Sequence, residues 1–174
     1  MMRLCVDQCD RYTNLKKTQT FAPNGELVFS DRRNHRIRKI NRTSGWIETI
    51  AGRGAECTYV PSEDGGLALN ACLRDPSAAL YHGNDLYIAD TGNYLIRRVN
   101  AWNGTIDHVV GGGSFPSIRD NVPATKTSMT LKSFTVCENK DVYIVNGGAG
   151  FSYLRRISNG VITQFSGMSY LPIM

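Results

Sequence analysis

The sequence of 174 residues contains no apolar run approaching the roughly 18 residues that a membrane-spanning helix needs. Its first residues place Asp7, Asp10 and Arg11 where a secretory signal peptide needs an apolar stretch, so we expect no such signal. Proline is scarce, with six residues, and no biased tract is present, which argues against a collagenous, mucin-like or disordered chain. The compartment stays open: cytoplasmic if the start is native, extracellular if the chain is a piece of a longer protein.

Hydrophobic residues make up 41% of the chain and charged residues 20%, which suits one globular domain. The formal net charge of +5 is concentrated in residues 1–54, which hold eleven Lys and Arg against five Asp and Glu. A basic surface can meet nucleic acid or an anionic partner, but an excess of this size is more typical of a solvated face.

The five cysteines contain no Cys-x-x-Cys pair, so the sequence predicts neither a zinc site nor a thioredoxin-type motif. Cys57 and Cys72 lie in one connecting segment. A disulfide between them would stabilise the fold by about 3 kcal/mol in an oxidising compartment. In a reducing compartment they would be small buried hydrophobic residues, which is the interpretation that we prefer at this point.

Helical periodicity is absent, but an internal repeat is present. Residues 27–54 match residues 86–113 without a gap, and residues 142–167 form a third copy. Arg38 recurs in these copies as Arg97 and Arg155, so we predict a structural role for these three arginines. Each copy consists of short β-branched or aromatic runs separated by Gly, Asn and Asp, which predicts four strands per copy. The predicted strands cover residues 18–22, 26–30, 36–41 and 46–50, then 77–82, 86–89, 95–100 and 105–110, then 133–137, 141–145, 153–157 and 161–165.

An Asp-x-x-Asn sequence joins the second and third predicted strands of the first two copies, as Asp31 with Asn34 and Asp90 with Asn93. Short carboxylate and amide side chains bond nearby backbone groups where a chain reverses, so we predict a structural role for these four residues in the turns. The next turn needs a positive φ, which glycine supplies. The glycines at this place are Gly45, Gly104 and Gly160.

Four-stranded units that repeat at this spacing are typical of the blades of a β-propeller. The copies resemble repeats of the NHL family, in which a strand is followed by Asp-x-x-Asn-x-x-Ile-Arg-Lys/Arg-Val/Ile, a glycine turn and a strand ending in Ala/Val-Gly-x-Gly. The resemblance covers about residues 18–167, and the connector motif Asp-Gly-Gly-x-Ala-x4-Leu-x2-Pro is matched from Asp64 to Pro76. The third copy departs from it, with Asn146 in place of Asp and residues 147–150 in place of the Asn-bearing turn.

The resemblance implies an all-β fold: a β-propeller of NHL-type four-stranded blades, of which this chain holds about three, a partial or half propeller. We expect an N-terminal extension over residues 1–17, blades over about 18–52, 76–111 and 132–167, and a C-terminal tail over 168–174. An open arc of three blades exposes apolar faces at both ends. Either the chain is a fragment of a longer protein, or it self-associates to complete a propeller.

Alternation and recurrence between copies predict the core positions. These are Leu27, Phe29, Ile37, Ile40, Ile47, Leu86, Ile88, Ile96, Val99, Ile106, Val142, Ile144, Leu154, Ile157 and Ile162.

The candidate binding surface lies at one end of the blades, because the turn between strands two and three and the connector to the next blade meet there. Loops on a rigid scaffold are where function usually lies. The predicted binding residues are Arg32, Arg33, His35, Arg36, Arg53, Tyr94 and Phe151. Their cations and aromatic rings could also provide the phosphate contacts and stacking surfaces that single-stranded RNA requires.

Three functions remain open. The preferred interpretation is a non-catalytic platform that binds a protein partner, as the family resemblance implies. RNA binding is the first alternative, and a fragment of a propeller-type lyase or hydrolase is the second. We expect no enzyme activity, no metal and no cofactor, because His35, His82 and His108 occupy non-equivalent positions of the repeat and no catalytic constellation can be assigned from spacing.

Overall fold

The computed structural model describes residues 19–116, 119–147 and 152–165. The chain divides into two compact units, and each is described by itself. The first unit covers Lys17–Val109, and the second contains the residues from Val110 onward. Within the described residues every helix is a three-residue 3-10 turn, and none is long and apolar enough to cross a membrane. The expectations for residues 1–17, for the tail 168–174 and for Phe151 fall outside the described residues.

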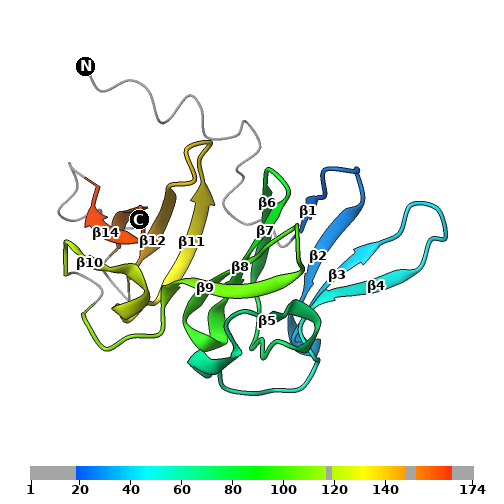
Figure 1. Ribbon diagram of the computed structural model, residues 1–174, viewed down its shortest axis with the longest axis horizontal. Coiled ribbons are helices and arrows are strands. Elements are labelled where there is room, and N and C mark those ends of the chain that lie inside the picture. Colours follow the sequence, from blue (N-terminus) through cyan, green and yellow to red (C-terminus); the bar gives the residue numbers. More distant parts are fainter. Residues whose placement is uncertain (1–18, 117–118, 148–151, 166–174) are drawn as a thin grey trace. The chain divides into compact units, whose positions relative to one another are not determined.

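Three antiparallel sheets carry the fold, which confirms the all-β prediction (Figure 1). The first has the order β1-β2-β3-β4. Its strands are β1 (Gln19–Phe21), β2 (Leu27–Asp31), β3 (Arg36–Ile40) and β4 (Ile47–Ala51). The second has the order β5-β9-β8-β7-β6. Its strands are β5 (Gly66–Leu67), β6 (Ala78–His82), β7 (Asp85–Asp90), β8 (Leu95–Val99) and β9 (Thr105–Gly111).

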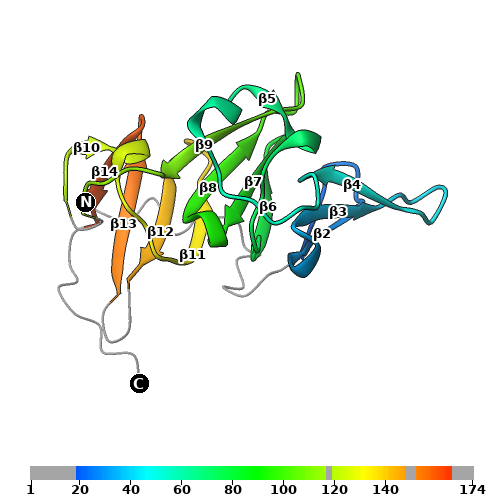
Figure 2. The ribbon, with the colours of Figure 1, turned by 90° about the horizontal axis from the view of Figure 1, so that it is seen from below.

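The third sheet, which Figure 2 shows from another side, has the order β10-β14-β13-β12-β11. Its strands are β10 (Val122–Pro123), β11 (Leu131–Val136), β12 (Val142–Asn146), β13 (Tyr153–Ser158) and β14 (Val161–Gln164). The four long strands of each sheet follow the predicted runs to within a few residues. The division of the chain into an extension, a propeller segment and a tail stays a prediction.

The outer strands β5 and β10 are additions that the sequence pattern did not predict. Each is a two-residue piece of the connector that precedes its sheet, paired with the last long strand, β9 or β14. A strand of two residues is too short to show the alternation by which strands are recognised in a sequence. The connectors are therefore part of the blades, which have five strands in the second and third sheets and four in the first.

The Asp-x-x-Asn turns form short 3-10 helices between strands two and three, over Arg32–Asn34 and Thr91–Asn93. In each turn the Asn side-chain amide donates a hydrogen bond to the carboxylate of the Asp three residues before it, at 2.8 Å in the first and 2.9 Å in the second. The residue after each turn, His35 or Tyr94, is left-handed with φ of 53° or 60°. In the following hairpins Gly45, Gly104 and Gly160 have φ of 72°, 69° and 77°, as predicted.

Asn146 takes the place of the turn aspartate in the third sheet. Its side-chain Oδ1 accepts a hydrogen bond from the Thr130 backbone N–H at 2.7 Å, just as Asp90 Oδ1 accepts one from the Arg74 N–H at 2.7 Å. An amide oxygen and a carboxylate oxygen are both acceptors, so this contact survives the replacement.

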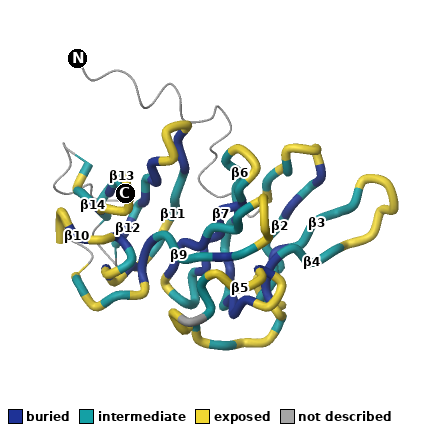
Figure 3. The backbone as a smooth tube through the Cα atoms, viewed as in Figure 1, coloured by how far each residue is buried: buried dark blue, intermediate teal, exposed yellow. Residues whose placement is uncertain are grey.

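The core of the first unit lies between the first and second sheets, where β1 and β2 pack beside β6 (Figures 1 and 2). The cluster consists of Val28, Ile37 and Ala51 from the first sheet, Ala68, Ala71 and Leu73 from the connector, and Ala79, Leu86, Ile88 and Ile106 from the second sheet. Most of β7 is accordingly buried in Figure 3, whereas the hairpin between β3 and β4 is exposed.

Part of the predicted core of the first blade is wrong. Ile47 is 51% exposed and Leu27, Phe29 and Ile40 are only half-buried, whereas Val28, which was not predicted, is fully buried. Side chains alternate between the faces of a strand, and the second sheet covers only the face of Val28 and Ile37. The other face has no neighbouring sheet within the described residues of this unit. Two predicted core positions in the later blades, Val99 and Leu154, are likewise only half-buried.

Candidate binding face around the second blade's connector

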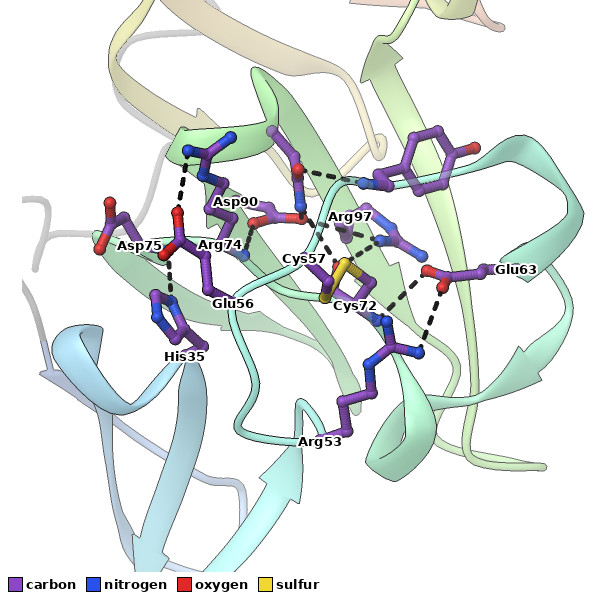
Figure 4. The surroundings of a disulfide bond; sticks show 12 residues. His35, Arg53, Glu56, Cys57, Glu63, Cys72, Arg74, Asp75, Asp90 and Arg97 are labelled. Carbon is purple, nitrogen blue, oxygen red and sulfur yellow. Dashed lines mark hydrogen bonds and ion pairs between the residues drawn. A yellow bond between two sulfur atoms is a disulfide. The ribbon is translucent and has the colours of Figure 1, made fainter.

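The connector of residues 52–77 is held by a disulfide between Cys57 and Cys72, whose Cα atoms lie 5.7 Å apart (Figure 4). The preferred interpretation of these cysteines as two reduced hydrophobic residues was therefore wrong. The physical reason is tertiary, because the connector folds back over the second sheet and brings both cysteines within the distance that a disulfide requires. Their separation of 15 residues in the sequence does not by itself specify that return.

Arg97 of β8 is the centre of the contacts beneath the connector, and its side chain is fully buried. Its guanidinium lies 3.7 Å from Asp90 Oδ2, 3.6 Å from Asp64 Oδ1 and 3.5 Å from the Cys72 carbonyl oxygen. The Tyr59 ring covers it at 4.7 Å from the ring centroid. Arg97 thus joins the turn, the connector and the strand, in agreement with the structural role that its recurrence in the repeat predicted.

A second group of side chains, Tyr59, Asp64 and His108, was missed by the sequence analysis. The Tyr59 hydroxyl donates to Asp64 Oδ2 at 2.9 Å and lies 2.9 Å from His108 Nδ1, and His108 Nδ1 also hydrogen-bonds with Asp64. Burial, reinforced by the Asp64 carboxylate, raises the pKa of the Tyr59 phenol, which keeps it a donor. No signal marks Tyr59 and His108 in the sequence, because neither recurs in another copy.

The contacts of Asp64 recur in the third blade, which assigns it to the scaffold. Asp64 Oδ1 accepts the His108 backbone N–H at 3.1 Å and pairs with Arg97. Asp120 Oδ1 accepts the Gln164 backbone N–H at 2.6 Å and pairs with Arg155 at 2.6 Å. The His–carboxylate pair is thus built on a structural aspartate. In the described part of the chain no group of three or more His, Cys, Asp or Glu side chains could hold a metal ion.

The turn carboxylate Asp90 has no exposure to solvent. Burial raises its pKa from 3.8 to about 6, against the lowering effect of hydrogen bonds from the Arg74 N–H and the Asn93 side chain and of the Arg97 charge. The folded state therefore binds this proton more tightly than the unfolded state does. Asp90 stabilises the fold below its unfolded pKa, and this contribution is lost as the pH rises through about 6.

We expect Asp90→Asn to remove this pH dependence while keeping the turn, because Asn146 shows that an amide can accept the connector N–H at this position. The wild-type free energy of unfolding should fall relative to that of the variant by roughly 2–3 kcal/mol as the pH rises from about 4 to about 6. Urea unfolding of both proteins across this range measures the difference. Parallel stability curves for the two proteins would contradict the assignment.

The predicted binding residues of the first unit lie close together, but many of them contact the connector. His35 Nδ1 accepts the Asp75 backbone N–H at 3.2 Å. The Arg36 guanidinium packs against Gly54 and donates to the Arg53 carbonyl oxygen at 3.4 Å. The Gly92 N–H donates to the Arg74 carbonyl oxygen at 2.8 Å, so residues 74–75 link the first turn to the second.

Two of the arginines near this face form ion pairs with acidic side chains, which the distribution of charges along the sequence did not reveal. Arg53 lies 3.7 Å from Glu63, and Arg74 lies 2.9 Å from Glu56 (Figure 4). By contrast, Arg32, Arg33 and Arg36 have no acidic side chain within ion-pair distance among the described residues. These three residues are called the arginine turn below. Tyr94, in the second turn, is 58% exposed.

The sequence matches no family model, and a search of curated proteins finds no match. Solved structures do match. A protein of unknown function from Bacteroides thetaiotaomicron has a TM-score of 0.59 at 18% identity, covering 86% of this chain and 35% of that chain. An auxiliary nutrient binding protein from the same organism has a TM-score of 0.54 at 17% identity, covering 72% of this chain and 33% of that chain. A gluconolactonase from Xanthomonas campestris has a TM-score of 0.53 at 13% identity, covering 88% of this chain and 48% of that chain.

At these identities the likeness concerns the fold alone. The chain spans about a third to a half of the length of these solved structures. The neighbours are β-propeller proteins, and their agreement with the three repeated sheets confirms the fold class. The finer assignment to NHL repeats stays a resemblance. The chain is accordingly a β-propeller-type protein with three consecutive blades.

Proposed function

We propose that this chain is a non-catalytic binding module that holds an acidic segment of a protein partner on the arginine turn. The observation that carries the proposal is that Arg32 and Arg33 are exposed without an acidic partner in the described chain, whereas the neighbouring Arg53 and Arg74 are paired. The exposed Tyr94 ring, on the turn linked to them through residues 74–75, adds an aromatic contact. Arginine and tyrosine are enriched among the residues that dominate protein interfaces.

The same face is less suited to single-stranded RNA. Glu56, Glu63 and Asp75 interleave with its arginines, and negative charges along the path of a phosphate backbone oppose binding. Stacking of successive bases needs several aromatic rings, and in the described residues of this face Tyr94 is the exposed one.

The proposal of a non-catalytic role rests on the shared architecture of the blades. Asp64 and Arg97, the polar groups that a catalytic interpretation of the His108 site would need, have counterparts in Asp120 and Arg155 that make the same scaffold contacts. We further propose that the chain works in an oxidising compartment, because the disulfide between Cys57 and Cys72 persists under such conditions.

The test compares a labelled acidic peptide with single-stranded oligo(U) RNA, by fluorescence anisotropy at low and high salt. We expect saturable binding of the peptide, weakened tenfold or more, equivalent to about 1.4 kcal/mol, by Arg32→Ala, Arg33→Ala and Arg36→Ala together. Arg42→Ala is the matched control, because Arg42 follows β3 and lies at the opposite end of that strand.

Two outcomes would oppose the proposal. Tight RNA binding with a steep salt dependence would support the nucleic-acid alternative instead. Equal weakening of peptide binding by Arg42→Ala would show a diffuse effect of net charge rather than a site on the arginine turn.

A further inference from the structure

The outer edges of the second and third blades are closed by the same backbone contacts from their connectors. In the second blade the Gly65 N–H donates to the Ile106 carbonyl oxygen at 3.0 Å, and the Ala68 N–H to that of Gly104 at 2.9 Å. The third blade repeats both bonds. There the Asn121 N–H donates to Ile162 at 2.9 Å, and the Ala124 N–H to Gly160 at 2.8 Å.

An aspartate precedes each of these connector pieces and joins the edge to a buried arginine. Asp64 accepts the His108 N–H and pairs with Arg97. Asp120 accepts the Gln164 N–H and pairs with Arg155. The two arginine side chains are 0% and 1% exposed. Residues 64–68 and 120–124 are called the closing segments below, and both have the pattern Asp-Gly/Asn-x-x-Ala.

The edge of the first blade carries the equivalent backbone groups and arginine, but among the described residues no closing segment pairs with it. The repeat places Gly45, Ile47 and Thr49 where Gly104, Ile106 and His108 stand in the second blade. In the part of the chain that the structure describes, β4 pairs only with β3. Arg38, the counterpart of Arg97, is 24% exposed, and among the described residues its one ion-pair partner is Asp31, at 3.7 Å.

The register of the hairpin directs the backbone groups of this edge outward. The Asn41 N–H bonds to the Trp46 carbonyl, and Ile40 then faces Ile47 and Arg38 faces Thr49. In an antiparallel pair, residues alternate between bonding to the partner strand and pointing away from it. The N–H and C=O groups of Ile47 and Thr49 therefore point away from β3, as a β-strand from another chain would require.

We propose that the outer edge of β4 and Arg38 form a β-addition site for an extended segment of a separate partner polypeptide with the pattern Asp-Gly/Asn-x-x-Ala. The two closed blades specify the chemistry of the occupant. Its aspartate would pair with Arg38 and accept the Thr49 N–H, while its N–H groups would donate to Ile47 and Gly45. Addition of a strand to an exposed edge combines backbone affinity with side-chain specificity.

The second and fifth positions of the pattern provide the specificity. Gly65 and Asn121 both have positive φ, 80° and 59°, which glycine and asparagine adopt most readily. Ala68 and Ala124 are 3% and 0% exposed, so a larger side chain at this position would meet the blade. Ile47, 51% exposed where Ile106 and Ile162 are 0% and 1%, supplies apolar surface at the same edge.

The test uses a labelled synthetic peptide that copies residues 63–70, which carry the closing segment of the second blade. Fluorescence anisotropy of the full chain with this peptide should show saturable binding. A peptide with the Asp64→Asn replacement should bind at least tenfold more weakly, and so should the unmodified peptide to Arg38→Met. In Arg33→Ala the peptide should still protect the Thr49 N–H from hydrogen exchange, which separates this site from the arginine turn.

Amide hydrogen exchange locates the peptide on β4. The Thr49 N–H should exchange fast in the free protein and be protected when the peptide is bound. Thr49→Pro, which removes this donor at an edge where proline is tolerated, should abolish binding while circular dichroism reports retained β-structure.

Three results would overturn the proposal: no saturable binding, equal binding of the two peptides, or protection of the Thr49 N–H in the free chain that is lost when residues 1–18 are deleted. The last would assign the edge to a segment of this chain rather than to a partner.

Discussion

Replacement of Arg97 by methionine should lower the free energy of unfolding by about 3–5 kcal/mol, the cost of leaving a buried charge without its partner. Arg97 is 0% exposed and faces Asp90, also 0% exposed, and Asp64. Methionine fills a similar length of space but cannot compensate either carboxylate. Urea unfolding at neutral pH measures the loss. The deficit should shrink under acidic conditions, because Asp90, whose pKa burial already raises to about 6, then takes up a proton.

Arg38→Met is the matched control, since it makes the same chemical change at the equivalent position of the first blade. Arg38 is 24% exposed, and the one acidic partner that the described part of the chain gives it, Asp31, lies 3.7 Å away with similar exposure. We expect a loss of about 0–1 kcal/mol, the usual range for a solvent-exposed ion pair. Equal losses for the two variants would show that burial beneath the connector does not increase the contribution of Arg97 to the free energy of unfolding.

Removal of the disulfide by Cys57→Ser with Cys72→Ala should destabilise the protein by about 3 kcal/mol, the cost expected for a loop of 15 residues. The bond ties the connector across Arg97, whose guanidinium contacts the Cys72 carbonyl oxygen. Thermal or urea unfolding of the double variant against wild type measures the change. We use substitution rather than a reducing agent because Cys137 is also disulfide-bonded.

The same variant should show where the disulfide acts. Hydrogen exchange should accelerate in the connector of residues 52–77 and leave the pairing of β1 with β2 unchanged, because the bond closes a loop outside the first sheet. An unaltered melting temperature would show that the remaining contacts, with Arg97 at their centre, suffice to hold the connector.

The candidate site was predictable only in part. Recurrence in the copies identified Arg97 as structural, and the Asp-x-x-Asn spacing identified the turns. The ion pairs of Arg53 with Glu63 and of Arg74 with Glu56 could not be inferred, because the partners are ten or more residues apart and meet only through the path of the connector. These pairs reduce the predicted basic surface to the arginine turn.

The sequence by itself determined the repeat, the strands and the turns. These features are local: strand preference, alternation and a glycine with positive φ act over a few residues, so they recur wherever the motif recurs. Ile47 and Ile106 show what such a pattern cannot determine. The two isoleucines occupy the same place in the repeat, yet one is 51% exposed and the other fully buried.

Only the tertiary structure decided that difference, because burial depends on what packs against a blade. The face of the second blade that carries Ile106 packs against the first blade, and its own connector pairs with its edge. Within the described residues the first blade packs against the second through its other face, and neither a sheet nor a connector strand covers the face and edge that carry Ile47. The disulfide, the burial of Arg97 and the unpaired edge of β4 follow from the same cause. Each depends on where a connector returns in space, and that path is set by contacts between residues far apart in the chain.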